Sequence, residues 1–219
     1  LIDVTSTGML VDAVTLTATG TWTYNQLNGL CYALRPTGGN TNTENATLVT
    51  ADLSGAVCSG STICNMSGLF RSCTALTTVT LPAGGTDIVT YFSNLFYHCK
   101  ALKSVTNLDK FTNVNSFSNA FSNSILTSVT LSPSGSSAAA GVNFGNAFEG
   151  CSKLTSVVNL DKFKNASSFS STFESCKLLP SVTLCPEGST VDADITFYNA
   201  FKGCKALTSI ANLDKYTKA

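Results

Sequence analysis

The stretch Phe96-Tyr97-His98-Cys99-Lys100-Ala101-Leu102-Lys103-Ser104-Val105 has the form F-x-x-C-x-x-L-x-S-V and decides the fold. Its first Phe recurs at positions 70, 121, 148, 173 and 201, so successive copies lie 25 to 28 residues apart. The copy at Phe121 is degenerate, because it is one residue short and has Ser124 in place of Cys. A period in this range is the signature of a solenoid, in which stacked repeats bury a continuous core.

A second apolar residue stands four positions before each of these Phe residues, and it is aromatic in every copy but the first, which has Met66. Spacing of i, i+4 places two side chains on one face of a helical turn. We therefore predict one short helix per repeat, with its Phe and Cys side chains facing the core. The predicted core residues are Phe70, Phe96, Phe121, Phe148, Phe173, Phe201, Cys73, Cys99, Cys151, Cys176 and Cys204.

The segment after each Cys has the pattern L-x-x-V-x-L, as in Leu76–Leu81, and its β-branched residues and alternation are typical of a short strand. The predicted fold is an α/β repeat solenoid, a leucine-rich-repeat-like right-handed β/α superhelix. It has one parallel sheet and about seven coils. The handedness follows from the rule for crossovers between parallel strands.

Two kinds of repeat alternate. In short repeats V-x-L is followed by Pro or a Gly/Ser-rich turn, whereas long repeats insert one residue and continue as N-L-D-K-aromatic, at 107–111, 159–163 and 212–216. We assign residues 61–219 to the repeats and residues 1–60 to an N-terminal cap with an irregular first coil. In the cap, Leu10–Trp22 is a candidate covering strand and Leu48–Leu53 a candidate first ladder strand. The chain begins at Leu1 and stops just inside a long repeat, which favours a fragment of a longer protein.

The strings Ala147-Phe148-Glu149-Gly150-Cys151, continued by Leu154–Val157, and Ala200–Cys204, continued by Leu207–Ser209, resemble the BspA-like leucine-rich repeats. Asn107–Val114 is similar to the related repeat, about 26 residues long, of bacterial surface proteins. The resemblance covers roughly residues 60–216. It implies a bacterial protein that is extracellular or at the cell surface and acts in adhesion, coaggregation or binding to host matrix. It supplies no catalytic residues.

Composition excludes some classes of partner. Only 12% of residues are charged and the net charge is zero, so the chain presents no basic surface to nucleic acid. No apolar stretch is long enough to span a bilayer, so we expect no membrane insertion by this segment. We expect a monomer without a cofactor.

Nine cysteines leave at least one unpaired in a monomer. We interpret the five in the repeated motif as buried thiols that behave as small hydrophobes, with disulfides or a metal as the alternatives. Cys58 and Cys64 lie outside that motif, and a bridge between them in the cap is possible. No cysteine or histidine spacing matches a zinc site.

The candidate catalytic groups favour no enzyme. His98 is the only histidine, and its neighbour Cys99 is predicted to be buried, so neither a Ser-His-Asp nor a Cys-His arrangement is expected. Asp109, Asp161 and Asp214 recur every second coil, about 10 Å apart, which is too far for shared proton chemistry or a common cation. We interpret them as turn residues that accept backbone N–H bonds beside solvated lysines.

The outward face of the strand ladder is the usual binding surface of a solenoid. Here it presents small hydroxyls and none of the Trp, Tyr or Arg side chains that usually dominate interfaces. The leading hypothesis is a non-catalytic module for adhesion to host protein or matrix, with a glycan-binding module or a structural spacer as alternatives; the rim residues Tyr97, Lys100, Lys103 and Lys153 are a second candidate surface. The predicted face consists of Thr78, Thr80, Ser104, Thr106, Ser128, Thr130, Ser156, Ser181, Thr183 and Ser209, with Val158 and Ala211 at the same outward positions.

Overall fold

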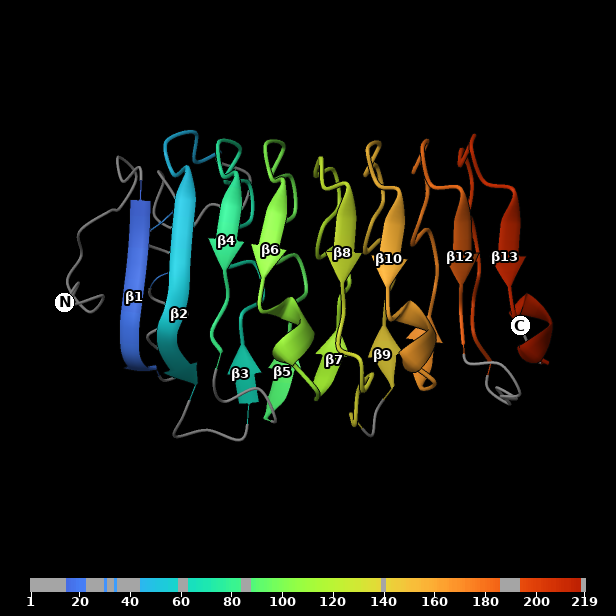
Figure 1. The fold of residues 1–219 in the computed structure, drawn as a ribbon, viewed down its shortest axis with the longest axis horizontal. Coiled ribbons are helices and arrows are strands. Elements are labelled where there is room, and N and C mark those ends of the chain that lie inside the picture. Colours follow the sequence, from blue (N-terminus) through green and yellow to red (C-terminus); the bar gives the residue numbers. More distant parts are fainter. Residues whose placement is uncertain are drawn as a thin grey trace.

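A computed structural model describes residues 15–22, 30, 34, 44–58, 63–83, 88–138, 141–185 and 194–217; for Cys58 it describes the backbone alone. The chain is a parallel β-solenoid of about five turns with almost no helix (Figure 1). Strands on one face run antiparallel to those on the other, and the coils stack side by side from the N-terminal to the C-terminal end (Figure 1).

The first face, which we call the ladder face, holds eight parallel strands. The strands are β1 (Thr15–Trp22), β2 (Thr50–Cys58), β4 (Thr78–Thr80), β6 (Ser104–Thr106), β8 (Ser128–Thr130), β10 (Ser156–Val158), β12 (Ser181–Thr183) and β13 (Ser209–Ala211). Hydrogen bonding divides them into three groups, β1-β2-β4-β6, β8-β10 and β12-β13. The ladder is therefore open between β6 and β8 and again between β10 and β12. Figure 1 shows visibly wider spacing at these two places.

The two openings follow the long repeats. Each long repeat continues from its ladder strand into a 3-10 turn, η1 (Leu108–Lys110), η2 (Leu160–Lys162) or η3 (Leu213–Lys215). Figure 1 shows η1 between the coils of β6 and β8, and η2 between those of β10 and β12. Each turn begins after an Asn in the left-handed conformation, such as Asn107 with φ 67°. We infer that the extra residue occupies the space between coils and keeps the next strand out of hydrogen-bonding range.

The second face carries a continuous five-stranded parallel sheet. Its strands are β3 (Ile63–Asn65), β5 (Val89–Tyr91), β7 (Val114–Ser116), β9 (Val142–Asn143) and β11 (Ala166–Ser168). The expectation of one parallel sheet is therefore wrong. These strands are two or three residues long and mostly polar, as in β11, so they give no strand pattern in the sequence. Each one follows a ladder strand and completes one turn.

The expected seven coils and the α/β class are not confirmed, because the structure has about five turns and almost no helix. The expected number of seven coils included an irregular first coil within residues 1–60. In the described part of that region β1 and β2 belong only to the ladder, and β2 pairs in parallel with β4. The strands predicted around Leu10–Trp22 and Leu48–Leu53 do form, as β1 and β2. The boundary near residue 60 and the right-handed winding stay predictions.

The segment predicted to be a short helix is instead a column of turns, which we call the spine. It consists of residues 66–73, 92–99, 117–124, 144–151, 169–176 and 197–204. In the first segment the N–H groups of Met66, Gly68, Phe70 and Ser72 donate to carbonyls of the next coil at N···O distances of 2.7 to 3.1 Å. Leu69, Arg71 and Cys73 close turns by donating to the carbonyl of the third residue back. The third and seventh residue of every segment has positive φ, which no α-helix allows.

The helix prediction failed because this turn pattern repeats every four residues. It places i and i+4 on the same side of the backbone, as a helix does. The inward direction of the Phe and Cys side chains was therefore predicted correctly, although the predicted helical backbone was wrong. Asn or Gly occupies most of the positive-φ positions, and these residue types adopt the left-handed conformation most readily.

The core between the two faces contains two columns of stacked phenylalanines. One runs from Phe70 to Phe201, with neighbouring ring centroids 5.4 to 5.7 Å apart. The other runs from Phe92 to Phe197, at 5.2 to 5.6 Å. The aromatic residue of each long repeat contacts this second column edge-on, as Phe163 does against Phe144. Stacking at these distances adds to the burial of apolar area that holds the coils together.

Candidate functional site

The ladder face places the predicted binding residues in one surface. All ten of them are exposed or half-buried, and Thr80 and Ser156 are the two half-buried ones. Val158 and Ala211 are exposed at the same outward positions, and Val158 retains 45% of its accessible surface. The structure thus brings these side chains together across successive coils, and their role in binding stays a prediction.

The two openings expose part of the apolar interior of the ladder. Val79, Val129 and Val182, each at the centre of a strand, are buried. Val105 and Val157 occupy the same place in β6 and β10, on the N-terminal side of the two openings, and they are only half-buried, whereas Val129 and Val182 on the opposite side of the openings stay buried. A neighbouring strand at hydrogen-bonding distance normally covers such a residue. The ladder face is therefore loosened after β6 and after β10.

The opening between β10 and β12 forms a pocket, which we call the slot. It is lined by Thr155, Ser156, Val157, Asp161, Ser181, Val182 and Thr183. Three of the predicted face residues line it, together with the carboxylate of η2. Sequence reasoning placed the hydroxyls on this face but missed that the two coils separate here.

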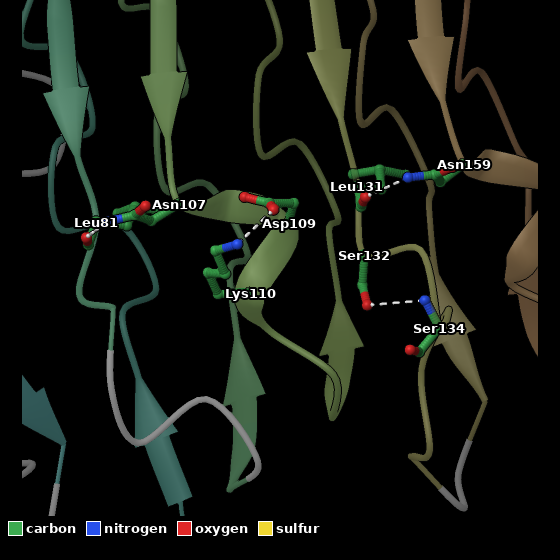
Figure 2. A network of polar contacts seen from close by, with 8 residues as sticks. All are labelled: Leu81, Asn107, Asp109, Lys110, Leu131, Ser132, Ser134 and Asn159. Atoms are coloured by element: carbon green, nitrogen blue, oxygen red, sulfur yellow. Dashed lines mark hydrogen bonds and ion pairs between the residues drawn. The ribbon is translucent and has the colours of Figure 1, made fainter.

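Side-chain amides join neighbouring coils into pairs, and the openings lie between these pairs. Asn107 Nδ2 donates to Leu81 O at 2.9 Å, and Asn159 Nδ2 donates to Leu131 O at 2.9 Å (Figure 2). Asn212 makes the same bond to Cys185 O at 2.6 Å. Each amide joins a long repeat to the short repeat before it and thus works within a pair. The superperiod of about 52 residues in the sequence is consequently a structural unit of two coils.

The aspartates of the 3-10 turns form ion pairs with the lysines that follow them. The Nζ–Oδ2 distances are 3.1 Å for Lys110–Asp109, 2.7 Å for Lys162–Asp161 and 2.9 Å for Lys215–Asp214 (Figure 2 shows the first). Both partners of each pair are partly exposed, so each pair contributes little to stability. The lysines expected to be solvated alone are thus paired with carboxylates.

The cysteine column lies inside the spine. Cys73, Cys99, Cys151 and Cys176 are free and buried, and Cys204 in the last coil is free and half-buried. Each thiol from Cys99 onward donates to a Phe carbonyl of the preceding coil, for example Cys151 Sγ to Phe121 O at 3.0 Å and Cys176 Sγ to Phe148 O at 3.1 Å. Burial raises the pKa of the Cys151 thiol to about 11, and it also raises the pKa of Cys99 well above its ordinary value. These thiols are therefore protonated donors and poor nucleophiles at neutral pH.

Cys64 lies in β3, outside the column, and is disulfide-bonded. The side chain of Cys58 lies outside the described residues, so the Cys58–Cys64 pairing stays a prediction.

His98 is half-buried in the spine at φ 58°, and its ring stacks on Tyr97 with centroids 4.1 Å apart. Desolvation, with the nearby charges of Lys100 and Arg71, lowers the pKa of His98.

In the described part of the chain, no group of three or more His, Cys, Asp or Glu side chains converges to hold a metal ion. None of the helices described there is long and apolar enough to cross a bilayer.

The degenerate copy at Phe121 does not interrupt the spine, because Phe121 N donates to Ala147 O and Asn123 N to Glu149 O. Ser124 replaces the column cysteine there and lies 3.4 Å from Cys151 Sγ.

The comparisons with known proteins agree with this geometry. A solved leucine-rich repeat protein from Bacteroides ovatus has a similar fold, with a TM-score of 0.53 and 18% sequence identity. The similarity covers 75% of this chain but only 37% of that one. No curated protein matches the sequence. The family model of the BspA-type leucine-rich repeat region matches six copies over residues 66–208, and repeats of this kind are typically non-catalytic interaction modules. The chain therefore belongs to the BspA-type leucine-rich repeat family.

Proposed function

We propose that this chain is a non-catalytic adhesion module, secreted by a bacterium or held at its surface, whose ladder face contacts a host protein or matrix component. The observation that carries the proposal is the ladder face itself. It exposes one type of small polar side chain over successive coils, and it is the face whose strands separate. A partner can contact it without displacing the core or the spine.

Two further observations support this proposal. Proteins of the family are commonly found on bacterial surfaces. Cys64 is disulfide-bonded, and disulfides persist in oxidising environments such as the cell exterior and are rare in the cytosol. The six free cysteines of the described residues do not conflict with an exterior location, because five are buried and Cys204 is half-buried.

The test is binding of the purified chain to immobilised host matrix proteins, measured by biolayer interferometry. One variant carries Ser104→Glu, Ser128→Glu, Ser156→Glu and Ser181→Glu on the ladder face. A matched control carries Ser137→Glu, Ser167→Glu, Thr196→Glu and Thr217→Glu, which are exposed hydroxyl positions outside the ladder strands and add the same charge. Circular dichroism and thermal unfolding establish that both variants fold.

We expect saturable binding that the ladder variant loses and the control retains, because four new carboxylates add charge and bulk to the contact surface. Equal loss in both variants would show a charge effect without a site on the ladder. Absence of binding by the parent chain to every immobilised protein would contradict the adhesion function and favour a structural spacer. Binding to mucin-type glycans alone would favour the glycan-binding alternative.

A further inference from the structure

Two features mark the slot between β10 and β12. The first is η2, which lies between the two coils (Figure 1). The second is Pro180, which stands immediately before β12 and leaves a carbonyl of the slot without a backbone donor. In the coils of β4, β6, β10 and β13 the residue at this position donates its backbone N–H to the coil before, as Thr155 does to Thr127 O at 2.8 Å and Thr208 does to Pro180 O at 2.9 Å. Proline has no N–H, so Pro180 cannot donate to Thr155 O.

The polar groups in the slot are mainly hydrogen-bond acceptors. Thr155 O has lost the donor that its place in the ladder would supply. The Thr155 hydroxyl donates its own hydrogen to Thr127 O at 2.9 Å, so its oxygen remains an acceptor. Lys162 pairs with Oδ2 of Asp161 at 2.7 Å, which leaves Oδ1 on that carboxylate. Ser156, Ser181 and Thr183 add hydroxyls that orient either way.

Two valines add apolar surface to the slot. Val157 from β10 and Val182 from β12 line it; Val157 is half-buried and Val182 is buried. A ligand that suits these acceptors and the two valines carries several donors and is weakly hydrated. The guanidinium of arginine has these properties, since it is planar with five N–H donors and is more weakly hydrated than an ammonium group. The single carboxylate of the slot is too little for a calcium or magnesium site.

We propose that the slot binds the guanidinium of an arginine side chain on the protein partner of the ladder face, with Asp161 and Thr155 O as its acceptors. This proposal rests on the proposed function, because it supplies an anchor point for the same partner. It also accounts for the lack of large aromatic or basic side chains on the ladder face: the anchoring side chain comes from the partner, and this chain supplies the pocket.

The test is an NMR titration of the isotope-labelled chain with the peptide acetyl-Gly-Arg-Gly-amide. Peptides with Lys or Gly in place of Arg are measured in parallel. We expect saturable shifts confined to the amides of 155–158, 161 and 181–183, stronger with the Arg peptide than with the Lys peptide and absent with the Gly peptide. Asp161→Asn is expected to weaken binding at least about tenfold, because it removes the charged acceptor while keeping the shape of the side chain.

The matched control is Asp214→Asn. Asp214 lies in the same N-L-D-K sequence and pairs with Lys215 in the same way, but within the described residues no strand follows β13 to close a slot beside it. This variant should bind the Arg peptide like the parent. Shifts that are spread over the surface, equal with the Lys peptide, or unchanged in Asp161→Asn would overturn the proposal.

The matrix-binding assay separates this proposal from the adhesion function. If the ladder variant loses matrix binding while Asp161→Asn keeps it in full, the adhesion function stands and the arginine anchor is wrong. If the Arg peptide binds in the slot but no matrix protein binds, the arginine site stands and the adhesion function fails. If Asp161→Asn weakens both interactions, both are supported.

Discussion

The spine and the ladder face differ in how they connect successive coils. In the spine, alternate N–H groups of the first five segments donate to the next coil, and thiols add a bond between coils. On the ladder face the hydrogen bonding stops after β6 and again after β10. Two columns of phenylalanine lie beneath the spine and are continuous. The stack is therefore held together by the spine and the core, and the ladder face is left free to open.

The largest expected effect of a single substitution is on the core beneath the spine. Phe148 is fully buried, with ring centroids 5.4 Å from Phe121 and 5.6 Å from Phe173. We expect Phe148→Ala to lower the free energy of unfolding by about 4 kcal/mol, because it removes a large side chain and leaves a cavity. The measurement is urea unfolding followed by circular dichroism.

The control for this prediction is Val157→Ala beside the slot. Val157 is half-buried, so its truncation should cost no more than about 1 kcal/mol. Comparable losses in the two variants would mean that the ladder face holds the coils together as strongly as the core does, and the contrast between spine and ladder would fail.

The thiol bonds of the spine give the next effect. Cys151 is buried, donates to Phe121 O at 3.0 Å and has a pKa raised by burial to about 11. At pH 7 we expect Cys151→Ala to cost about 2 kcal/mol through the lost hydrogen bond and the lost packing. An exposed thiol in the unfolded chain loses its proton near its ordinary pKa of 9.0, before the folded one does.

This difference in pKa makes the cost depend on pH. Between pH 9 and about 11 the folded parent binds more protons than the unfolded chain, so its stability falls as pH rises. The variant lacks this thiol, and its disadvantage should therefore shrink over that window. Urea unfolding of both proteins at pH 7, 9 and 10.5 measures the change. A cost that is the same at all three would mean that the Cys151 thiol is not buried as the structure has it.

A smaller effect is expected from the amides that join coils into pairs. Asn159 has φ 66° and donates through Nδ2 to Leu131 O at 2.9 Å. Asn159→Gly keeps the left-handed backbone and removes the bond, so we expect a loss of about 1 kcal/mol. Asn107→Gly, which removes the matching bond to Leu81 O, should cost the same. If both variants unfold like the parent, the paired strands alone hold the two-coil unit together.

Much of the architecture was predictable because repetition exposes it. The period, the inward Phe and Cys positions, the β-strand after each Cys and the two-coil superperiod are all properties of aligned copies. The spine was mistaken for helix because stacked turns with a period of four give the same i, i+4 spacing. The Asn and Gly at most of the third and seventh positions of the segments carried the missing signal, as in Asn119 and Asn123.

The second sheet and the slot were beyond the reach of pattern reasoning. The strands of the second sheet are too short and polar to show alternation, as β11 illustrates with its sequence Ala-Ser-Ser. The one-residue insertion of the long repeats was visible, but its consequence, two coils held apart, depends on how the extra residue packs against the next coil. Pro180 was also visible, in a place where other copies have Thr or Lys. The effect of this proline could not be predicted without knowing which backbone N–H groups form hydrogen bonds between ladder coils.

The smallest effect concerns Pro180 and compares the two openings. The one between β6 and β8 exists although Thr127, at the position matching Pro180, keeps its N–H. A 3-10 turn is therefore sufficient to separate neighbouring coils, and restoring the donor in Pro180→Thr should leave the slot open. We expect stability to fall by about 0.5 kcal/mol, because the unfolded chain gains conformational freedom. Hydrogen exchange at residue 180 should be fast, in contrast to the Thr155 amide, which donates to Thr127 O. A stabilised variant with a protected amide at 180 would show that proline opens the slot, and the two openings would then have different causes.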